Sequence, residues 1–211
     1  MFLFFVLMLV VLVGAWFRYN VSTKGKDQLK SIEACISKIE RNPSSPSAYD
    51  NFIEVWKSST WVQSEDLFNG GYYDRILKIC EKNSFNVKAW QLLGEVVQRL
   101  SITFGINASG KRSRSNTFRL LAGSLFKEFQ NPPIRERVLS LIHLVSGITQ
   151  AETQDLYNTS LKILEANPGT QEAKTLALDL GRLHYSILRP SKKPTIYDEQ
   201  AIQNDIIVRS K

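Results

Sequence analysis

Apolar residues recur three and four positions apart through most of the chain, which is the spacing of one face of an α-helix. The segments that this pattern predicts to be helical are 29–39, 48–56, 72–80, 89–100, 118–129, 134–145, 156–166 and 171–188, with a further short helix near 197–208. No block alternates polar and β-branched residues as a half-buried strand would. The pattern therefore predicts an all-α fold.

A short phrase recurs at four of the boundaries between these segments. A polar helix end is followed by Asn, and then by the next apolar-patterned segment, at Asn42, Asn83, Asn131 and Asn167. Six residues after the Asn, three copies carry Ala, at positions 48, 89 and 173. The copies are roughly 40 residues apart, a period typical of stacked helix pairs. The sequence therefore predicts an α-solenoid of antiparallel helix pairs.

The beginning of the chain is apolar throughout, and Phe2 to Phe17 contains no charged residue. A spanning helix needs roughly 20 apolar residues, with about 17 as the lower limit, and Trp16 and Tyr19 would lie at the membrane interface. A cleaved signal peptide, which would leave a secreted protein, is the alternative. However, no basic residue precedes Phe2 and no small-residue cleavage site follows the run. The sequence therefore favours a transmembrane anchor through Phe2 to Tyr19.

Basic residues follow this apolar run, at Arg18, Lys24, Lys26 and Lys30. Lys and Arg near a membrane span stay on the cytoplasmic side, so we expect a single-pass membrane protein with most of the chain on that side, or on the stromal or matrix side in an organelle. The predicted division is an anchor at 1–19, a juxtamembrane linker at 20–26, a helical repeat domain at 27–190 and a polar, basic tail at 191–211.

The segment Ala89-Trp90-Gln91-Leu92-Leu93-Gly94, after Glu81-Lys82-Asn83, resembles the tetratricopeptide repeat family. Helix pairs of that family open with a small residue and an aromatic, then Leu-Gly, after an Asn-Pro or Asp-Pro turn. The same register occurs at Asn42-Pro43 with Ala48-Tyr49 and at Asn167-Pro168 with Ala173-Lys174, so the resemblance covers roughly Asp27 to Leu188. Two long loops, 58–71 and 105–116, and Arg137 in place of Ala depart from the pattern. A different α-solenoid or a divergent helical bundle is the alternative.

The resemblance implies a concave groove lined by the first helix of each pair, which holds a peptide or helix of a partner. The residues at the matching exposed positions are Asp50, Glu54, Lys57, Gln91, Glu95, Arg99, Asp179 and Arg182. The alternative is that they form ordinary solvated helix faces. Their mixed charge lacks the basic run with which family members clamp an acidic C-terminal peptide. By analogy with anchored family members, the expected function is a protein-interaction scaffold or assembly factor, with another protein or a membrane-complex subunit as its partner.

The net charge of +7 suggests a second kind of contact. Part of it lies in a predicted loop with Lys111, Arg112 and Arg114, followed by Arg119. Such a loop would attract anionic lipid headgroups. RNA or DNA is not expected, because no aromatic residue is interleaved with these cations to stack on bases. The alternative function is therefore a peripheral tether to anionic lipid through the basic loop.

The sequence carries no recognisable catalytic or cofactor motif. His143 and His184 have no second ligand at metal-binding spacing. Cys35 and Cys80 lie on apolar helix faces, as small core residues do. Neither a glycine-rich phosphate loop nor a nucleophile elbow is present. We therefore expect no catalytic residue, no metal and no cofactor, and a binding protein rather than an enzyme.

Overall fold

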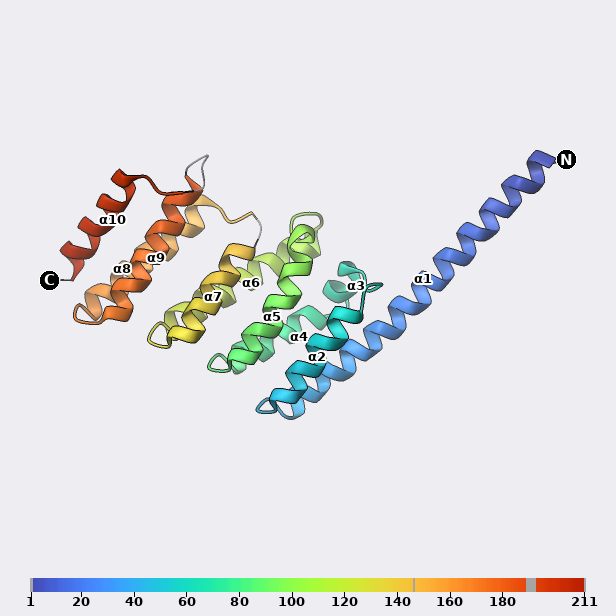
Figure 1. The fold of residues 1–211 in the computed structure, drawn as a ribbon, viewed down its shortest axis with the longest axis horizontal. Helices are drawn as coiled ribbons and strands as arrows, with labels where there is room; N and C mark the ends of the chain where they lie inside the picture. Colours follow the sequence, from blue (N-terminus) through green and yellow to red (C-terminus); the bar gives the residue numbers. More distant parts are fainter. Residues whose placement is uncertain (1, 146, 189–192, 211) are drawn as a thin grey trace.

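The computed structural model describes residues 2–145, 147–188 and 193–210. Every regular element among these residues is helical, which confirms the all-α prediction (Figure 1). The helices are α1 Phe2–Arg41, α2 Pro46–Ser58, α3 Ser64–Asn69, α4 Tyr72–Lys82, α5 Val87–Leu100, the 3-10 turn η1 Ser101–Thr103, α6 Ala108–Lys127, α7 Pro132–Leu144, α8 Gln150–Ala166, α9 Gln171–Ile187 and α10 Ile196–Arg209.

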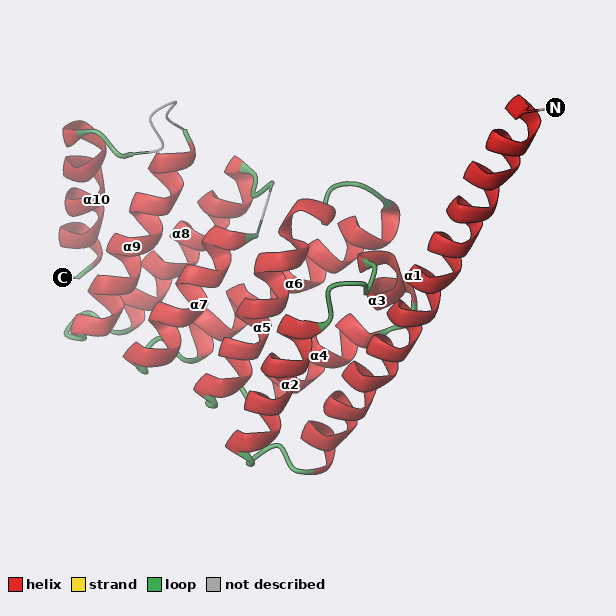
Figure 2. Cartoon of the chain, turned by 45° about the vertical axis from the view of Figure 1, so that its right-hand side comes forward, coloured by secondary structure: helices red, strands yellow, loops and turns green. Residues whose placement is uncertain are grey.

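The helices are arranged in two layers (Figures 1 and 2). One layer contains α1, α4, α6 and α8, each packed on the next, and the other contains α2, α5 and α7, followed by α9. Neighbours joined by short turns, α1 with α2, α4 with α5, α6 with α7 and α8 with α9, pack across the two layers, and α10 covers α8 and α9 at the C-terminal end. The core lies between the layers, with the side chains of Phe52, Trp56, Ile76, Trp90 and Leu121 almost completely buried.

Two Asn side chains of the recurring phrase, those of Asn83 and Asn167, cap the ends of helices. The last carbonyl groups of an α-helix have no partner within the helix. The side-chain amide of Asn83 donates to the carbonyl oxygen of Ile79 at 2.8 Å, and that of Asn167 donates to Ile163 at 2.9 Å. After the other two copies, at Asn42 and Asn131, proline begins the next helix at Pro46 and Pro132, where its missing N–H costs nothing. The phrase therefore ends one helix and allows the next to start.

The structure corrects the predicted membrane anchor. Within the described residues, no helix is both long enough and apolar enough to cross a membrane. The prediction of a single-pass membrane protein, with its cytoplasmic, stromal or matrix orientation, is therefore wrong. The apolar run stops at Arg18, short of the roughly 20 residues that a span requires. Residues 20–26, expected as a linker, are helical, because α1 continues without a break to Arg41.

The predicted basic loop is also helical. Residues 108–117 form the first half of α6, which Asn107 caps by accepting a hydrogen bond from the backbone N–H of Gly110. This half of α6 buries Gly110, Ser113 and Thr117. Thr117 is bonded to the Tyr73 hydroxyl at 2.6 Å. Because small and polar residues face the core here, an apolar pattern could not reveal the helix.

Candidate functional site

Residues predicted on two different helices meet at the exposed seam between α2 and α5. Lys57 Nζ of α2 lies 3.2 Å from Glu95 Oε1 of α5, and Lys88 Nζ lies 2.6 Å from Asp50 Oδ1. Glu54 of α2 is exposed and Gln91 of α5 is partly exposed. The packing of α2 on α5 therefore gathers the six predicted residues of these helices on two neighbouring elements.

Arg99 connects α5 to the end of α2. Its guanidinium lies over the Trp56 ring, 4.5 Å from the ring centroid, where a cation is attracted to the π face. It donates to the carbonyl oxygen of Trp56 at 3.1 Å and to that of Ser59, both at the C-terminal end of α2. Partial burial lowers the pKa of Arg99. The Trp56 indole in turn donates to the Glu95 carbonyl oxygen at 3.0 Å. Hydrogen bonds therefore run in both directions between α5 and the C-terminal end of α2.

A hollow of about 370 Å³ opens beside this corner. Its lining consists of Trp56, Lys57, Thr60, Glu95, Gln98 and Arg99. Two cations, a carboxylate and an amide therefore face one small space, and the Trp56 ring lies buried beneath the Arg99 guanidinium. Such a lining can both donate and accept hydrogen bonds, as the main chain and polar side chains of a peptide require.

The two predicted residues on α9 lie elsewhere. Arg182 makes a bidentate ion pair with Glu199 of α10, with hydrogen bonds of 2.8 and 3.2 Å. Asp179 is half-buried, and burial raises the pKa of its carboxyl group against the lowering influence of Arg135 and Arg182. Since α7 packs next to α5, the α9 residues are separated from the α2–α5 hollow.

Sequence reasoning missed the contribution of α7 to this layer. Glu136, Ser140 and His143 are exposed on α7, and the charges of Glu136 and His143 influence the Asp179 carboxyl group. Arg137 lies against Gly94 of α5, where an added Cβ would come within 3.0 Å of Nη2. The three- and four-residue spacing of the exposed polar positions is a signal that could have found this face.

A second hollow lies in the other layer, between α4 and α6, with a volume of about 690 Å³. Lys78, Arg119 and Lys127 contribute cations to its lining, and Asp74 and Glu81 contribute carboxylates. Its charges are thus nearly balanced. It is larger than the α2–α5 hollow, but Arg119 is the single predicted residue in its lining.

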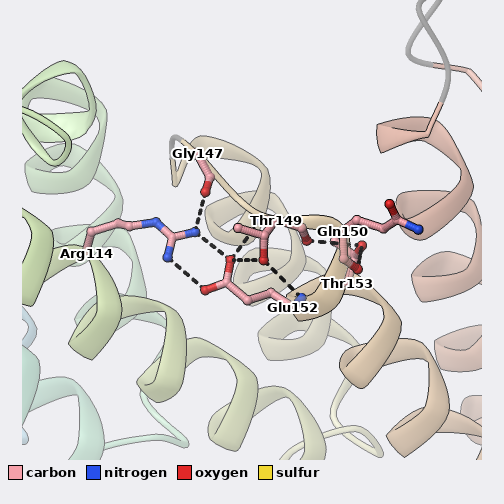
Figure 3. A network of polar contacts seen from close by, with 6 residues as sticks. All are labelled: Arg114, Gly147, Thr149, Gln150, Glu152 and Thr153. Atoms are coloured by element: carbon pink, nitrogen blue, oxygen red, sulfur yellow. Dashed lines mark hydrogen bonds and ion pairs between the residues drawn. The ribbon is translucent and has the colours of Figure 1, made fainter.

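The four cations predicted to bind lipid do not act together. Lys111 and Arg112 are exposed, whereas Arg119 faces the α4–α6 hollow. Arg114 is engaged by α8: it donates to both carboxylate oxygens of Glu152, at 2.8 and 2.7 Å, and to the Gly147 carbonyl oxygen at 2.7 Å (Figure 3). This region therefore does not form a single basic loop with four available cations.

Glu152 also caps α8. It accepts hydrogen bonds from the backbone N–H and the hydroxyl of Thr149, and its own N–H donates to the Thr149 hydroxyl, which is a capping box (Figure 3). The hydrogen bonds from Arg114 hold the pKa of the Glu152 carboxyl group below its usual range. The network therefore joins α6 to the first turn of α8.

The titratable groups of the core have structural positions. Cys35 and Cys80 are buried free thiols, and burial raises the pKa of both. His184 is buried and lies 3.1 Å from the Thr153 hydroxyl, whereas His143 is exposed. In the part of the chain that the structure describes, no group of three His, Cys, Asp or Glu side chains is placed to hold a metal ion.

Comparison with known proteins assigns this chain to no family. No family model matches the chain, and neither a curated protein nor a solved structure is significantly similar to it. The function is therefore inferred from the arrangement of the residues themselves.

Proposed function

We propose that this chain is a protein-interaction scaffold built as a tetratricopeptide-like α-solenoid. The proposal is supported by the alternation of helices between two layers and by the recurrence of the Asn phrase at the turns between helix pairs. Helix pairs stacked in this way present one extended layer to a partner. The layer of α2, α5, α7 and α9 carries all eight residues that the resemblance assigns to the groove.

The hollow between α2 and α5 is the observation that carries this proposal. It brings Lys57, Glu95 and Arg99 together, with Arg99 held against the buried Trp56 ring. The Lys57 side chain remains largely exposed, so it can also contact a partner. The partner that fits is a polar segment of another protein, with acceptors for Lys57 and donors for Glu95.

The wider role proposed is to hold that partner during the assembly of a larger complex. This step rests on analogy with the family that the chain resembles. It requires no catalytic residue and no cofactor, and the groove residues act by position and charge alone.

Site-specific photocrosslinking tests the proposal. A photoreactive amino acid is placed at Gln98, in the lining of the hollow, and in a matched protein at Lys162, which is exposed on α8 in the other layer. We expect a discrete crosslinked partner from position 98 and none from position 162. Equal crosslinking at both positions would contradict a binding site on the α2–α5 layer.

A charge swap then separates binding from folding. Glu95→Lys breaks the ion pair with Lys57, and the double variant Lys57→Glu with Glu95→Lys restores the pair in reverse. We expect the single variant to lose the crosslink and the double variant to lose it too, although the double variant regains the melting temperature of the wild type. If the double variant recovers the crosslink, the pair has a structural role only, and Lys57 and Glu95 do not contact the partner.

A further inference from the structure

Large apolar side chains are exposed along one edge of the helix array. Figure 1 shows that α2, α5, α7 and α9 end at this edge, the upper one in that view, and that α6, α8 and α10 begin there. The exposed apolar residues on these helix ends and connections, which we call the apolar edge, are Trp61, Ile102, Ile106, Leu144, Ile187, Leu188, Ile196 and Tyr197. Ile102 and Tyr197 are each 81% exposed.

This surface differs from the hollows described above. Connections between helices are normally polar, because their side chains face water. A row of exposed apolar residues instead marks a contact surface. The row follows the edge of the array through successive connections, so an extended surface covers it better than a single peptide would.

Cations flank the apolar residues. Lys111 and Arg112 are exposed in the first two turns of α6, shortly after Ile106. Beside Trp61, the ammonium group of Lys24 lies 5.8 Å from the centroid of the indole ring, and Lys26 is exposed nearby on α1.

The acidic groups of this edge are fewer or engaged. Glu65 and Asp66 lie in the first turn of α3, where Glu65 accepts a hydrogen bond from Asn107, and Asp27 pairs with Lys30. In the first turn of α10, next to Tyr197, Asp198 completes a capping box and Glu199 pairs with Arg182. Beside Trp61 and Ile106, positive charge therefore exceeds negative charge, and the complementary surface there is anionic.

The residue types point to lipid. Trp and Tyr favour the boundary between an apolar and an aqueous phase, where the ring is apolar and its polar atom remains hydrated. Lys and Arg next to such a boundary are attracted to anionic headgroups, each by about a fivefold gain in binding. A contact of this kind lies on the membrane surface and requires no helix to cross it.

The N-terminal part of α1 continues this apolar surface. It extends from the array at the same edge (Figure 1). Val11, Leu12 and Val13 are each more than half exposed, although consecutive helix positions point about 100° apart. No face of this short stretch is therefore covered within the chain.

We propose that the apolar edge rests on an anionic lipid surface. Ile102, Ile106 and Tyr197 enter the headgroup layer, and Lys111 and Arg112 contact lipid phosphates. The proposal is independent of the protein-binding function, because the edge shares no residue with the α2–α5 hollow. Partner binding and lipid binding can therefore fail separately.

An environment-sensitive dye on the full chain tests this contact. The nitrobenzoxadiazole dye is attached to Ile102→Cys, and in the control protein to Phe85→Cys, which is 70% exposed at the opposite edge, in the turn between α4 and α5. The native Cys35 and Cys80 are buried and remain unlabelled in the folded protein. Vesicles of phosphatidylcholine containing phosphatidylglycerol are compared with vesicles of phosphatidylcholine alone.

We expect the dye at position 102 to shift to the blue and brighten with the anionic vesicles, and the dye at position 85 to stay unchanged. Adding Lys111→Glu and Arg112→Glu to the position-102 protein should weaken vesicle binding by at least about tenfold. Sedimentation with vesicles without a response at position 102 would mean that α1 alone binds lipid, and would overturn the proposal. An equal dye response at positions 102 and 85 would overturn it as well. So would a response at position 102 that rises with protein concentration in the absence of vesicles, because the edge would then bind another copy of the chain.

Discussion

The indole Nε1 of Trp90 donates a hydrogen bond to the carbonyl oxygen of Ser84, 2.7 Å away, across the turn between α4 and α5. Tyr49 makes the equivalent contact at the connection between α1 and α2, where its hydroxyl donates to the Pro43 carbonyl oxygen at 2.9 Å. Both aromatic residues directly follow the Ala of the repeated phrase. The repetition in the sequence therefore encodes a repeated hydrogen bond that satisfies a turn carbonyl.

Replacing Trp90 with Phe tests the contribution of this bond. Trp90 is completely buried, so the variant leaves the Ser84 carbonyl without its donor and a small void beside the ring. We expect the free energy of unfolding to fall by about 2 to 3 kcal/mol, measured by urea denaturation followed by circular dichroism. Trp61→Phe is the control, because Trp61 is partly exposed, and should change stability by less than about 0.5 kcal/mol. Equal losses in the two variants would contradict the role of the turn contact.

The repeated phrase explains why much of the fold could be predicted. Asn83, Trp90 and Asn167 act within a few residues of their partners, so a local pattern reports them. The helix α3 could not be predicted, because its six residues are too few to show a helical period. The first half of α6 could not be predicted either, because the residues that it buries include Ser113 and Thr117, which are polar and give no apolar pattern. The predicted anchor is wrong, because the apolar run ends at Arg18 and is too short for a complete span.

In the candidate site, too, some features could be predicted from local patterns and others depend on how the helices pack. Exposed positions on α2 and α5 could be read from helical spacing, and the structure places Lys57 beside Glu95. The sequence could not indicate that Arg99 binds the end of α2 or that Arg182 pairs with Glu199 of α10. Those contacts join different helices and depend on how the helices pack.

The Arg114–Glu152 pair makes stability depend on pH. The folded-state pKa of Glu152 is lowered, first by its hydrogen bonds with Arg114, whereas an unfolded Glu titrates near about 4.3. The stabilisation is therefore complete above the unfolded pKa and is lost as the pH falls through the folded pKa. Glu152→Gln keeps a side chain that can complete the capping box, and should lower the free energy of unfolding by about 2 kcal/mol at neutral pH.

Denaturation curves of the wild type and Glu152→Gln across the acidic range check this expectation, and the difference between them should shrink below about pH 4. Lys30→Gln is the control, because the Lys30–Asp27 pair is well exposed and contributes less than about 0.5 kcal/mol. A difference that stays constant with pH would show that the carboxylate charge is not responsible.

The two thiols should be unreactive while the protein is folded. Cys35 and Cys80 are buried, and burial raises the pKa of each thiol, so little of the reactive thiolate forms near neutral pH. We expect negligible reaction with a thiol-specific disulfide reagent in buffer and the release of two equivalents in denaturant. Cys35 should be the faster of the two under mild destabilisation, because Cys80 is fully enclosed. Rapid labelling of Cys80 in the native protein would contradict this packing.

Gly181 and Gly123 provide a matched pair of helical glycines with opposite surroundings. A Cβ at Gly181 would come within 2.9 Å of Ile202 Cγ1 on α10 and 3.0 Å of the Tyr157 ring, whereas a Cβ at Gly123 meets nothing within 4 Å. Alanine favours a helix over glycine by about 1 kcal/mol, so Gly123→Ala should stabilise the protein by up to that amount. In Gly181→Ala the collision with α10 opposes this gain, and we expect a net loss of about 1 to 2 kcal/mol.

Thermal denaturation and amide hydrogen exchange distinguish the two effects. In Gly181→Ala the loss of exchange protection should be concentrated in α10 and the facing parts of α8 and α9, since these three helices pack together. Gly123→Ala should keep the wild-type exchange pattern with a higher melting temperature. If both variants gained stability, helix propensity alone would govern position 181, and the close approach of α10 to α9 would not constrain the C-terminal end of the array.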